Sequence, residues 1–422
     1  MRRRFLITLA TALAIALLAV SPAWAESKYK ILHAFGRGRD GAGVFAGLGL
    51  DPKGNLYGVT TGGGAYGSGT VFELTPGAGA EWNEKILHSF CQGGGRCSDG
   101  SLPWDTPVLD PEGNLYDDSN AGIFEMTPGP HGWTFKLIYS GGGSESQDDL
   151  ALYNAPGIDD LLLDAAGNLY GTFGVGKNYK GAIGELSLGT GGWKEEDIFD
   201  FCLHPHNFEC LGGSVPEFRL AWDASGNLYG VTTEGGADDG GVVFQLEYSG
   251  SAWKEHVLHS FRDSQSDGYR PYAGPVVDQA GNVYGTTAQG GGGAGCEPTG
   301  CGSVYRLSKG KNGQWAETIL YNFPDYPKNG GGPSAGLVFD QAGNLYGTAT
   351  GGGDPSCSCG VVFKLAPETG GKWKYTILHR FTGKDGYSPQ AGLIFDQDYK
   401  HLYGTTTEGG PGNYGVVFEI TP

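Results

Sequence analysis

The sequence predicts an all-β fold, specifically a seven-bladed β-propeller with four antiparallel strands in each blade. One phrase of the type "DQAGNLYGT" recurs seven times along the chain. Around each copy, β-branched and aromatic residues alternate with turn residues, which is typical of short strands. The first and last segments of the chain also read as complementary parts of one unit. A closed ring of repeated sheets explains all three observations.

The Asp that opens the phrase marks the period of the repeat. Its copies are separated by 54 to 62 residues, so one unit has about 57 residues. The seven positions are Asp51, Asp110, Asp164, Asp223, Asp278, Asp340 and Asp396. A regular period of this length predicts that each repeat is one small sheet with its turns.

Four strands are expected in each unit, as the sixth copy illustrates. Residues 335–340 predict a short first strand, and residues 345–350 predict a second. Between them, "QAGN" predicts a tight turn in which the glycine supplies a positive φ and the asparagine tolerates one. Residues 360–367 and 373–381 predict the third and fourth strands. The four strands together predict one antiparallel sheet.

The ends of the chain predict that the sheets close into a ring. Residues 27–35 read as a fourth strand alone, and residues 415–422 read as a third strand with no fourth. Pairing these two segments completes the last blade and covers its edge. We therefore expect residues 26–422 to form a single propeller whose last blade is closed by the N-terminal strand.

The combined pattern "LHSF…DG…GNLYGTT…GVVFKL" resembles the GloVer (Gloeobacter/Verrucomicrobia-type) tandem-repeat family of secreted bacterial proteins. The resemblance covers almost the whole chain after residue 25, and the seven copies make it specific. It implies secretion and a repeat architecture. It implies no established activity, so the function has to be argued from the residues.

Residues 1–25 are expected to be a signal peptide. A basic start, "MRRR", precedes an apolar run, and the segment ends in a small-residue cleavage site near Ala25. The segment "RRRFL" also fits a twin-arginine signal, so the export route stays open. The mature chain is expected to be secreted or periplasmic and to carry no membrane anchor.

The charge balance argues against polyanionic partners. The formal net charge is −18, and it becomes −21 after signal removal because three arginines and no acidic residue leave. Such a chain repels nucleic-acid phosphates and anionic lipid surfaces. We therefore expect no nucleic-acid partner. Disorder is disfavoured despite 78 glycines, because aromatic residues make up 12% of the chain and recur at fixed offsets.

The repeated phrase is interpreted as a structural turn. All copies stand between two predicted strands, so each copy builds a hairpin. Its aspartate is expected to accept backbone N–H bonds within the turn. A calcium site is disfavoured because each copy supplies too few carboxylates. The copy at Asp396 also lacks the Gly-Asn pair, a loss that a ligand site would tolerate poorly.

Comparison between units removes the histidines of the "LHxF" segments from the candidate catalytic residues. Some units hold tyrosine or phenylalanine there, and phenylalanine cannot replace an acid–base group. The seven residues are His33, His88, Tyr139, Phe199, His259, Tyr321 and His379. A flat ring packed between neighbouring blades fits them all. His204 and His206 lie close in sequence, but no further ligand has suitable spacing, so no metal site is predicted.

The eight cysteines fall into close pairs that predict disulfides in an exported chain. The pairs are Cys91–Cys97, Cys202–Cys210, Cys296–Cys301 and Cys357–Cys359. Two pairs lie in loops that lead from a fourth strand to the next blade, and two lie in loops between second and third strands. These two loop classes share one face of a propeller. The last pairing stays open because its ring would be small.

We expect the chain to act as a secreted, non-enzymatic binding module for a neutral glycan or another extracellular protein. Residues shared by all units build the frame, so a single site should use residues that differ between units. The candidates are Trp104, Tyr153, Tyr269, Arg270, Tyr272, Tyr326 and Tyr387. Sugar rings stack on aromatic faces, and nearby polar groups hydrogen-bond hydroxyls. An alternative in which these tyrosines only fill loop bases stays open.

Two other classes of function also stay open. Propellers host polysaccharide hydrolases and lyases, and the chain also suits a structural part of a cell surface. The sequence contains no phosphate-binding loop, nucleophile elbow or "HExxH" motif, so no cofactor is predicted. The negative charge disfavours a lyase acting on acidic sugars. A monomer is expected, and whether the chain catalyses any reaction is undecided at this point.

Overall fold

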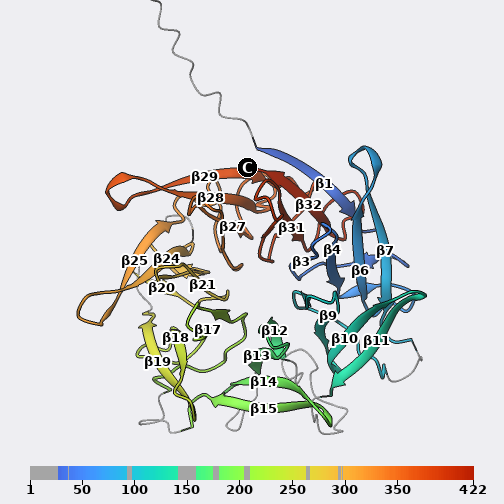
Figure 1. The fold of residues 1–422 in the computed structure, drawn as a ribbon. Helices are drawn as coiled ribbons and strands as arrows, with labels where there is room; N and C mark the ends of the chain where they lie inside the picture. Colours follow the sequence, from blue (N-terminus) through green and yellow to red (C-terminus); the bar gives the residue numbers. More distant parts are fainter. Residues whose placement is uncertain are drawn as a thin grey trace, which may run out of the picture.

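The fold is a seven-bladed propeller, as predicted. The computed structural model describes residues 27–36, 38–92, 97–140, 158–173, 180–203, 210–262, 267–292, 296 and 298–422. Seven four-stranded antiparallel sheets surround a common centre (Figure 1). The predicted signal peptide, residues 1–25, lies outside these ranges. Within them, no helix is long and apolar enough to cross a membrane.

Each blade runs from a short strand at the centre to a long strand at the rim (Figure 1). Blade 1 consists of β3 (Gly49–Leu50), β4 (Leu56–Thr60), β6 (Thr70–Pro76) and β7 (Trp82–Ser89). Blade 2 consists of β8 (Val108–Leu109), β9 (Leu115–Ser119), β10 (Gly122–Gly129) and β11 (Gly132–Tyr139). Blade 3 consists of β12 (Ile158–Leu163), β13 (Leu169–Phe173), β14 (Ala182–Gly189) and β15 (Gly192–Asp200).

The remaining blades repeat this order. Blades 4 to 7 consist of β16 (Ala221–Trp222), β17 (Leu228–Thr232), β18 (Val242–Tyr248) and β19 (Trp253–Ser260); β21 (Val276–Val277), β22 (Val283–Thr287), β24 (Ser303–Lys309) and β25 (Trp315–Asn322); β26 (Val338–Phe339), β27 (Leu345–Ala349), β28 (Val361–Pro367) and β29 (Trp373–Arg380); β30 (Ile394–Phe395), β31 (Leu402–Thr406), β32 (Val416–Thr421) and β1 (Lys28–Ala34). Short 3-10 turns occupy Ala78–Ala80 and Thr369–Gly371.

The N-terminal strand closes the ring, which confirms the prediction from the chain ends. β1 pairs antiparallel with β32, from Lys28 opposite Thr421 to Ala34 opposite Val416. Figure 1 shows the first strand of the chain lying beside the last one at the rim. The pairing gives β32 a partner on its outer side, so the last blade has the same four strands as the others.

Aromatic rings pack each blade against the next. Phe35 follows β1, and its ring centroid lies 5.2 Å from that of Phe72 in blade 1. Gly58 permits this contact, because a Cβ atom there would lie 2.5 Å from Phe72 Cζ. Five further pairs repeat the arrangement: Phe90–Phe124, Phe201–Phe244, Phe261–Tyr305, Phe323–Phe363 and Phe381–Phe418. The hydrophobic core therefore lies mainly between the blades.

The repeated phrase forms the turn between the first two strands of a blade. Asp51 Oδ1 accepts the backbone N–H groups of Lys53 and Asn55, as predicted, and Gly54 has a φ of 87°. Asn55 plays a different role from the predicted one. It has no positive φ, and its Nδ2 instead donates to Asp51 Oδ2 at 2.8 Å. Tyr57 Oη donates to the same carboxylate, which therefore ties the turn to the second strand.

Removing residues 27–35 is expected to destabilise the whole ring. The deletion leaves β32 without its outer partner and removes the buried side chains of Leu32 and Phe35, so the loss should be on the order of 5 kcal/mol or more. Thermal unfolding and size-exclusion chromatography measure the effect. The exposed-residue variant Lys28→Ala is the control, and a deletion variant that melts and elutes like the parent would contradict the closure.

Candidate functional site

One face of the ring carries the disulfides, and we call it the cysteine face. The loop that enters a blade pairs there with the loop between its second and third strands, as β2 (Gly41–Ala42) with β5 (Gly62–Gly63) and β20 (Gly268–Tyr269) with β23 (Gln289–Gly290). The two loop classes therefore share a face, as predicted. The three predicted bridges, Cys91–Cys97, Cys202–Cys210 and Cys296–Cys301, are present. Cys357 and Cys359, whose pairing the sequence left open, are also bonded to each other.

The centre of the ring contains a cavity of about 530 Å³, which we call the channel cavity. Its walls are the innermost strands and the segments that lead into them from the cysteine face. The side chains that distinguish one blade from another here are Phe45, Trp104, Asp105, Thr106, Phe218, Arg219, Tyr272, Ser334 and Gln390. These six blades therefore line the cavity with different side chains, although the strands that form it repeat.

Two aromatic pairs belong to this lining. The Phe45 and Trp104 rings lie 4.4 Å apart between blades 1 and 2, and Trp104 keeps 46% of its surface exposed. The Phe218 and Tyr272 rings lie 5.9 Å apart, edge to face, between blades 4 and 5. The two pairs stand three blades apart around the ring, so one bound molecule can meet aromatic surface from two sides.

The lining segments are fixed by hydrogen bonds from the preceding blade. Thr405 Oγ1 donates to the carbonyl oxygen of Ala46 at 2.7 Å, across the closure between blades 7 and 1. Equivalent bonds run from Thr286 to Ala335 and from Thr348 to Ala391. Each of these threonines is buried. The residue before each alanine therefore projects from a firmly held backbone.

The predicted candidate residues separate into two groups. Trp104 and Tyr272 line the channel cavity. The other described candidates lie outside its lining. The guanidinium of Arg270 lies 5.4 Å above the Tyr269 ring, and Tyr387 is 37% exposed in the loop that enters blade 7. Tyr153 lies outside the described residues.

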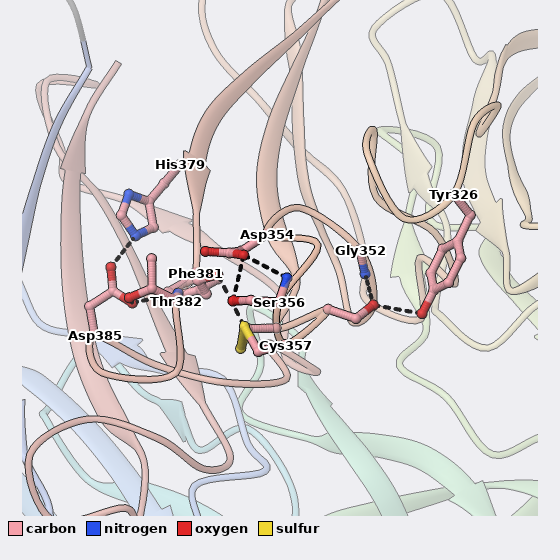
Figure 2. The surroundings of a disulfide bond; sticks show 11 residues. Tyr326, Gly352, Asp354, Ser356, Cys357, His379, Phe381, Thr382 and Asp385 are labelled. Atoms are coloured by element: carbon pink, nitrogen blue, oxygen red, sulfur yellow. Dashed lines mark hydrogen bonds and ion pairs between the residues drawn. A yellow bond between two sulfur atoms is a disulfide. The ribbon is translucent and has the colours of Figure 1, made fainter.

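Tyr326 has a structural role in its loop. Its hydroxyl lies 2.6 Å from Ser358 Oγ, and that oxygen accepts the backbone N–H of Gly352 (Figure 2). Figure 2 shows its ring directed at the loop that carries Cys357. Tyr326 thereby joins the loop that enters blade 6 to the disulfide-bonded loop of the same blade. For Tyr326, the structure therefore agrees with the alternative in which the tyrosine fills the base of a loop.

The "LHxF" positions lie at the junctions between neighbouring blades, as predicted. His88 stacks on Phe135 with ring centroids 4.3 Å apart, and Tyr321 stacks on Tyr375 at 4.0 Å. At the last junction, His379 stacks on Tyr29 at 3.8 Å. The partner in each case comes from the fourth strand of the next blade.

At two junctions a histidine at the "LHxF" position faces both an aspartate and a glutamate, and the sequence did not predict these sites. His33 faces Asp40 and Glu84, and His259 faces Asp267 and Glu317. Burial raises the pKa of Glu84 and of Glu317 to about 7, and the adjacent Asp40 and Asp267 add to the shift. The signal was present in the sequence, because each set joins the "LHxF" histidine, the "DG" aspartate and the residue two places after the recurrent tryptophan.

Glutamates also hold this position in blades 3 and 4, as Glu195 and Glu255, where the "LHxF" residue is a tyrosine or a phenylalanine. Glu255 belongs to the junction with Phe199, and burial raises the pKa of its carboxyl to about 7. Gly212 occupies the place of the "DG" aspartate, where a Cβ atom would lie 2.4 Å from Glu255 Oε2. Among the residues that the structure describes, none hydrogen-bonds Glu255 Oε1. His204 and His206 lie outside those residues.

Residues 201–418 match the Gloeobacter/Verrucomicrobia repeat, so the chain belongs to this family of repeat proteins. No curated protein matches the chain. Among solved structures, it is similar to YCF48 from Cyanidioschyzon merolae, with 15% identity, a TM-score of 0.52, and coverage of 93% of this chain and 98% of that one.

A second similar structure is the extracellular domain of the putative one-component system BT4673 from B. thetaiotaomicron. The identity is 12% and the TM-score is 0.53, over 93% of this chain. The match covers only 40% of the BT4673 chain. At such low identities, both similarities show the propeller fold and nothing about activity.

Glu255→Gln is expected to stabilise the protein at pH 8 and to have little effect at pH 4. The folded-state pKa of about 7 exceeds the unfolded value, so the folded protein holds this proton more tightly. Stability is then lost as the pH rises from about 4.5 to 7, by about 1–3 kcal/mol, and an amide avoids this loss. Urea unfolding at both pH values measures it. Glu368→Gln, at an exposed carboxyl, is the control, and equal effects of Glu255→Gln at the two pH values would contradict the assignment.

Proposed function

We propose that this protein is a non-catalytic binding module that takes a neutral carbohydrate into the channel cavity from the cysteine face. The observation that carries the proposal is the presence of two aromatic pairs, Phe45 with Trp104 and Phe218 with Tyr272, around one cavity. The C–H face of a sugar ring packs on such aromatic surfaces. Export through the expected signal peptide would place the module among extracellular glycans.

The size and polarity of the cavity support this proposal. Its volume of about 530 Å³ lies within the usual range of small-molecule sites, roughly 300–1,000 Å³. Thr106, Ser334 and Gln390 supply hydroxyl and amide groups beside the rings. Hydroxyl and amide groups can both donate hydrogen bonds to sugar hydroxyls and accept hydrogen bonds from them, which suits a ligand rich in hydroxyl groups.

The charge of the lining favours a neutral ligand. Among the residues that the structure describes, the charged ones in the lining are one cation, Arg219, and one carboxylate, Asp105. The chain as a whole carries a net charge of −18, which repels anionic polymers at a distance. An acidic polysaccharide would therefore find neither a cationic cavity nor a favourable approach, whereas a neutral sugar meets no charge repulsion.

The same lining favours binding over turnover. Glycoside hydrolysis uses two carboxyl groups placed on either side of the scissile bond. Among the described residues that line the cavity, Asp105 is the only carboxyl. Asp105 with Arg219 suits orientation of a ligand, so we favour a binding module over a hydrolase.

A Trp104→Ala, Tyr272→Ala double variant is expected to lose neutral-glycan binding by at least about tenfold. One face is removed from each aromatic pair, and each contact contributes on the order of 1 kcal/mol. A glycan array followed by calorimetry on the best ligand measures the change. The variant Tyr387→Ala is the matched control, because this tyrosine lies on the same face but outside the cavity.

The results separate the alternatives. Binding that survives the double variant, or an absence of binding to every neutral glycan, would overturn the proposal. Release of reducing ends or of unsaturated sugars from a polysaccharide panel would instead show an enzyme. Equal loss in the Tyr387→Ala control would place the ligand on the outer loops.

A further inference from the structure

We propose that two of the seven blade junctions are divalent metal sites. The first consists of His33, Asp40 and Glu84, between blades 7 and 1. The second consists of His259, Asp267 and Glu317, between blades 4 and 5. In each set, one ligand atom from every residue lies within 4.8 Å of the others. These sites lie on the outer part of the ring and are separate from the proposed carbohydrate site.

The first set has one imidazole nitrogen facing two carboxyl groups. His33 Nε2 lies 3.3 Å from Asp40 Oδ1 and 3.6 Å from Glu84 Oε1. The histidine belongs to β1, the aspartate to the following loop and the glutamate to β7. An ion bound here would therefore link the first strand of the chain to the first blade, across the point where the ring closes.

The second set repeats this arrangement four junctions away. His259 Nε2 lies 3.1 Å from Asp267 Oδ1 and 3.9 Å from Glu317 Oε2. The three side chains are 12–20% exposed, and they line an open hollow of about 640 Å³. A hydrated ion can thus reach them. Arg262 also lines this hollow, but its Nε lies 3.8 Å from Asp238 Oδ2 and 70% of its side chain is exposed.

Backbone groups orient both aspartates. Asp40 Oδ1 accepts the N–H of Gly41, and its Oδ2 accepts the N–H of Gly36. Asp267 is held in the same way by the N–H groups of Gly268 and Arg262. Ligands that are fixed by a second layer of hydrogen bonds are typical of metal sites, because they need not reorganise when the ion binds.

The glutamates supply a second, independent observation. Glu84 Oε1 and Glu317 Oε1 are buried, and neither has a hydrogen-bond partner among the described residues. Each carboxyl also faces the aspartate of its own set. One proton shared between the glutamate and the aspartate of a set relieves their repulsion. When both carboxyls are ionised they repel one another, and a cation between them removes the repulsion and satisfies the buried oxygens.

Comparison of the junctions shows that two blades can pack against each other without a His–Asp–Glu set. The other five junctions combine the same two positions differently, with a ring pair or with a glutamate opposite a tyrosine or a phenylalanine. These pairs are His88 with Phe135, Tyr139 with Glu195, Phe199 with Glu255, Tyr321 with Tyr375, and His379 with Tyr29. Stacked rings close three of these junctions, so the two complete His–Asp–Glu sets are an additional feature.

The ligand types favour a transition-metal ion of the Zn²⁺ class. Zn²⁺ binds one imidazole and two carboxylates readily and completes four-coordination with water. Ca²⁺ prefers six to eight oxygen ligands, which these sets do not supply. Because each set takes ligands from two blades, the bound ion would act as a cross-link between them and would stabilise the ring.

The test is zinc binding by the oxidised full-length protein, freed of metal with EDTA and confirmed to contain no free thiols. Equilibrium dialysis at pH 7.5 should give two Zn²⁺ per chain. Glu84→Gln and Glu317→Gln should each leave one, and the double variant none. The control Glu255→Gln, at the junction whose "LHxF" residue is Phe199, should keep two. Zn²⁺ should raise the Tm of the parent and the control but not that of the double variant.

Several results would overturn the proposal. These are a parent protein that binds no Zn²⁺, a double variant that still binds two, or loss of the ions in a His204→Gln, His206→Gln variant. If the double variant fails to fold, His33→Gln with His259→Gln replaces it, and unchanged stoichiometry there has the same meaning. Binding of Ca²⁺ in place of Zn²⁺ would also contradict the assignment.

Discussion

The structure depends on the contact between neighbouring blades. Each blade is a thin sheet with apolar side chains on both faces, so it buries them only by packing against a blade on either side. Phe35 against Phe72 is one such contact, and it falls at the closure. If the ring opened at this point, one apolar face of blade 7 and one of blade 1 would be exposed together. The pairing of β1 with β32 therefore protects every other junction as well as its own.

A repeated contact of this kind leaves some positions free to vary. The buried phenylalanines must fill a fixed space beside a glycine, as Phe72 does beside Gly58. Further out, solvent is near and the facing pair can consist of two rings, a ring and a carboxyl, or the complete His–Asp–Glu set. The junction thus combines an inner layer, a pair of aromatic rings at six of the seven junctions, with a variable outer layer that is available for other chemistry.

The sequence predicted the fold because period, strand pattern and chain ends all required the same ring. It predicted the site only in part. Trp104 and Tyr272 stand six residues before the turn aspartate and four before an innermost strand, and they reach the cavity. Tyr387 and Tyr326 stand nine and fourteen residues before it, and they lie in the loops outside the cavity. Position relative to the innermost strand, rather than residue type, decides which side chains line the channel.

Of the lining residues that the sequence did not predict, some follow this rule and two depart from it. Phe45 also stands six residues before its aspartate, whereas Phe218 and Arg219 replace the alanine and glycine that most units have there. The His–Asp–Glu sets were missed for another reason, because their ligands come from two consecutive repeats and meet only when the blades pack. In a ring, the residues at the centre converge from all blades and those at the rim meet only in neighbouring pairs. A ligand site shared by the whole protein is therefore favoured at the centre, and local cross-links are favoured at the rim.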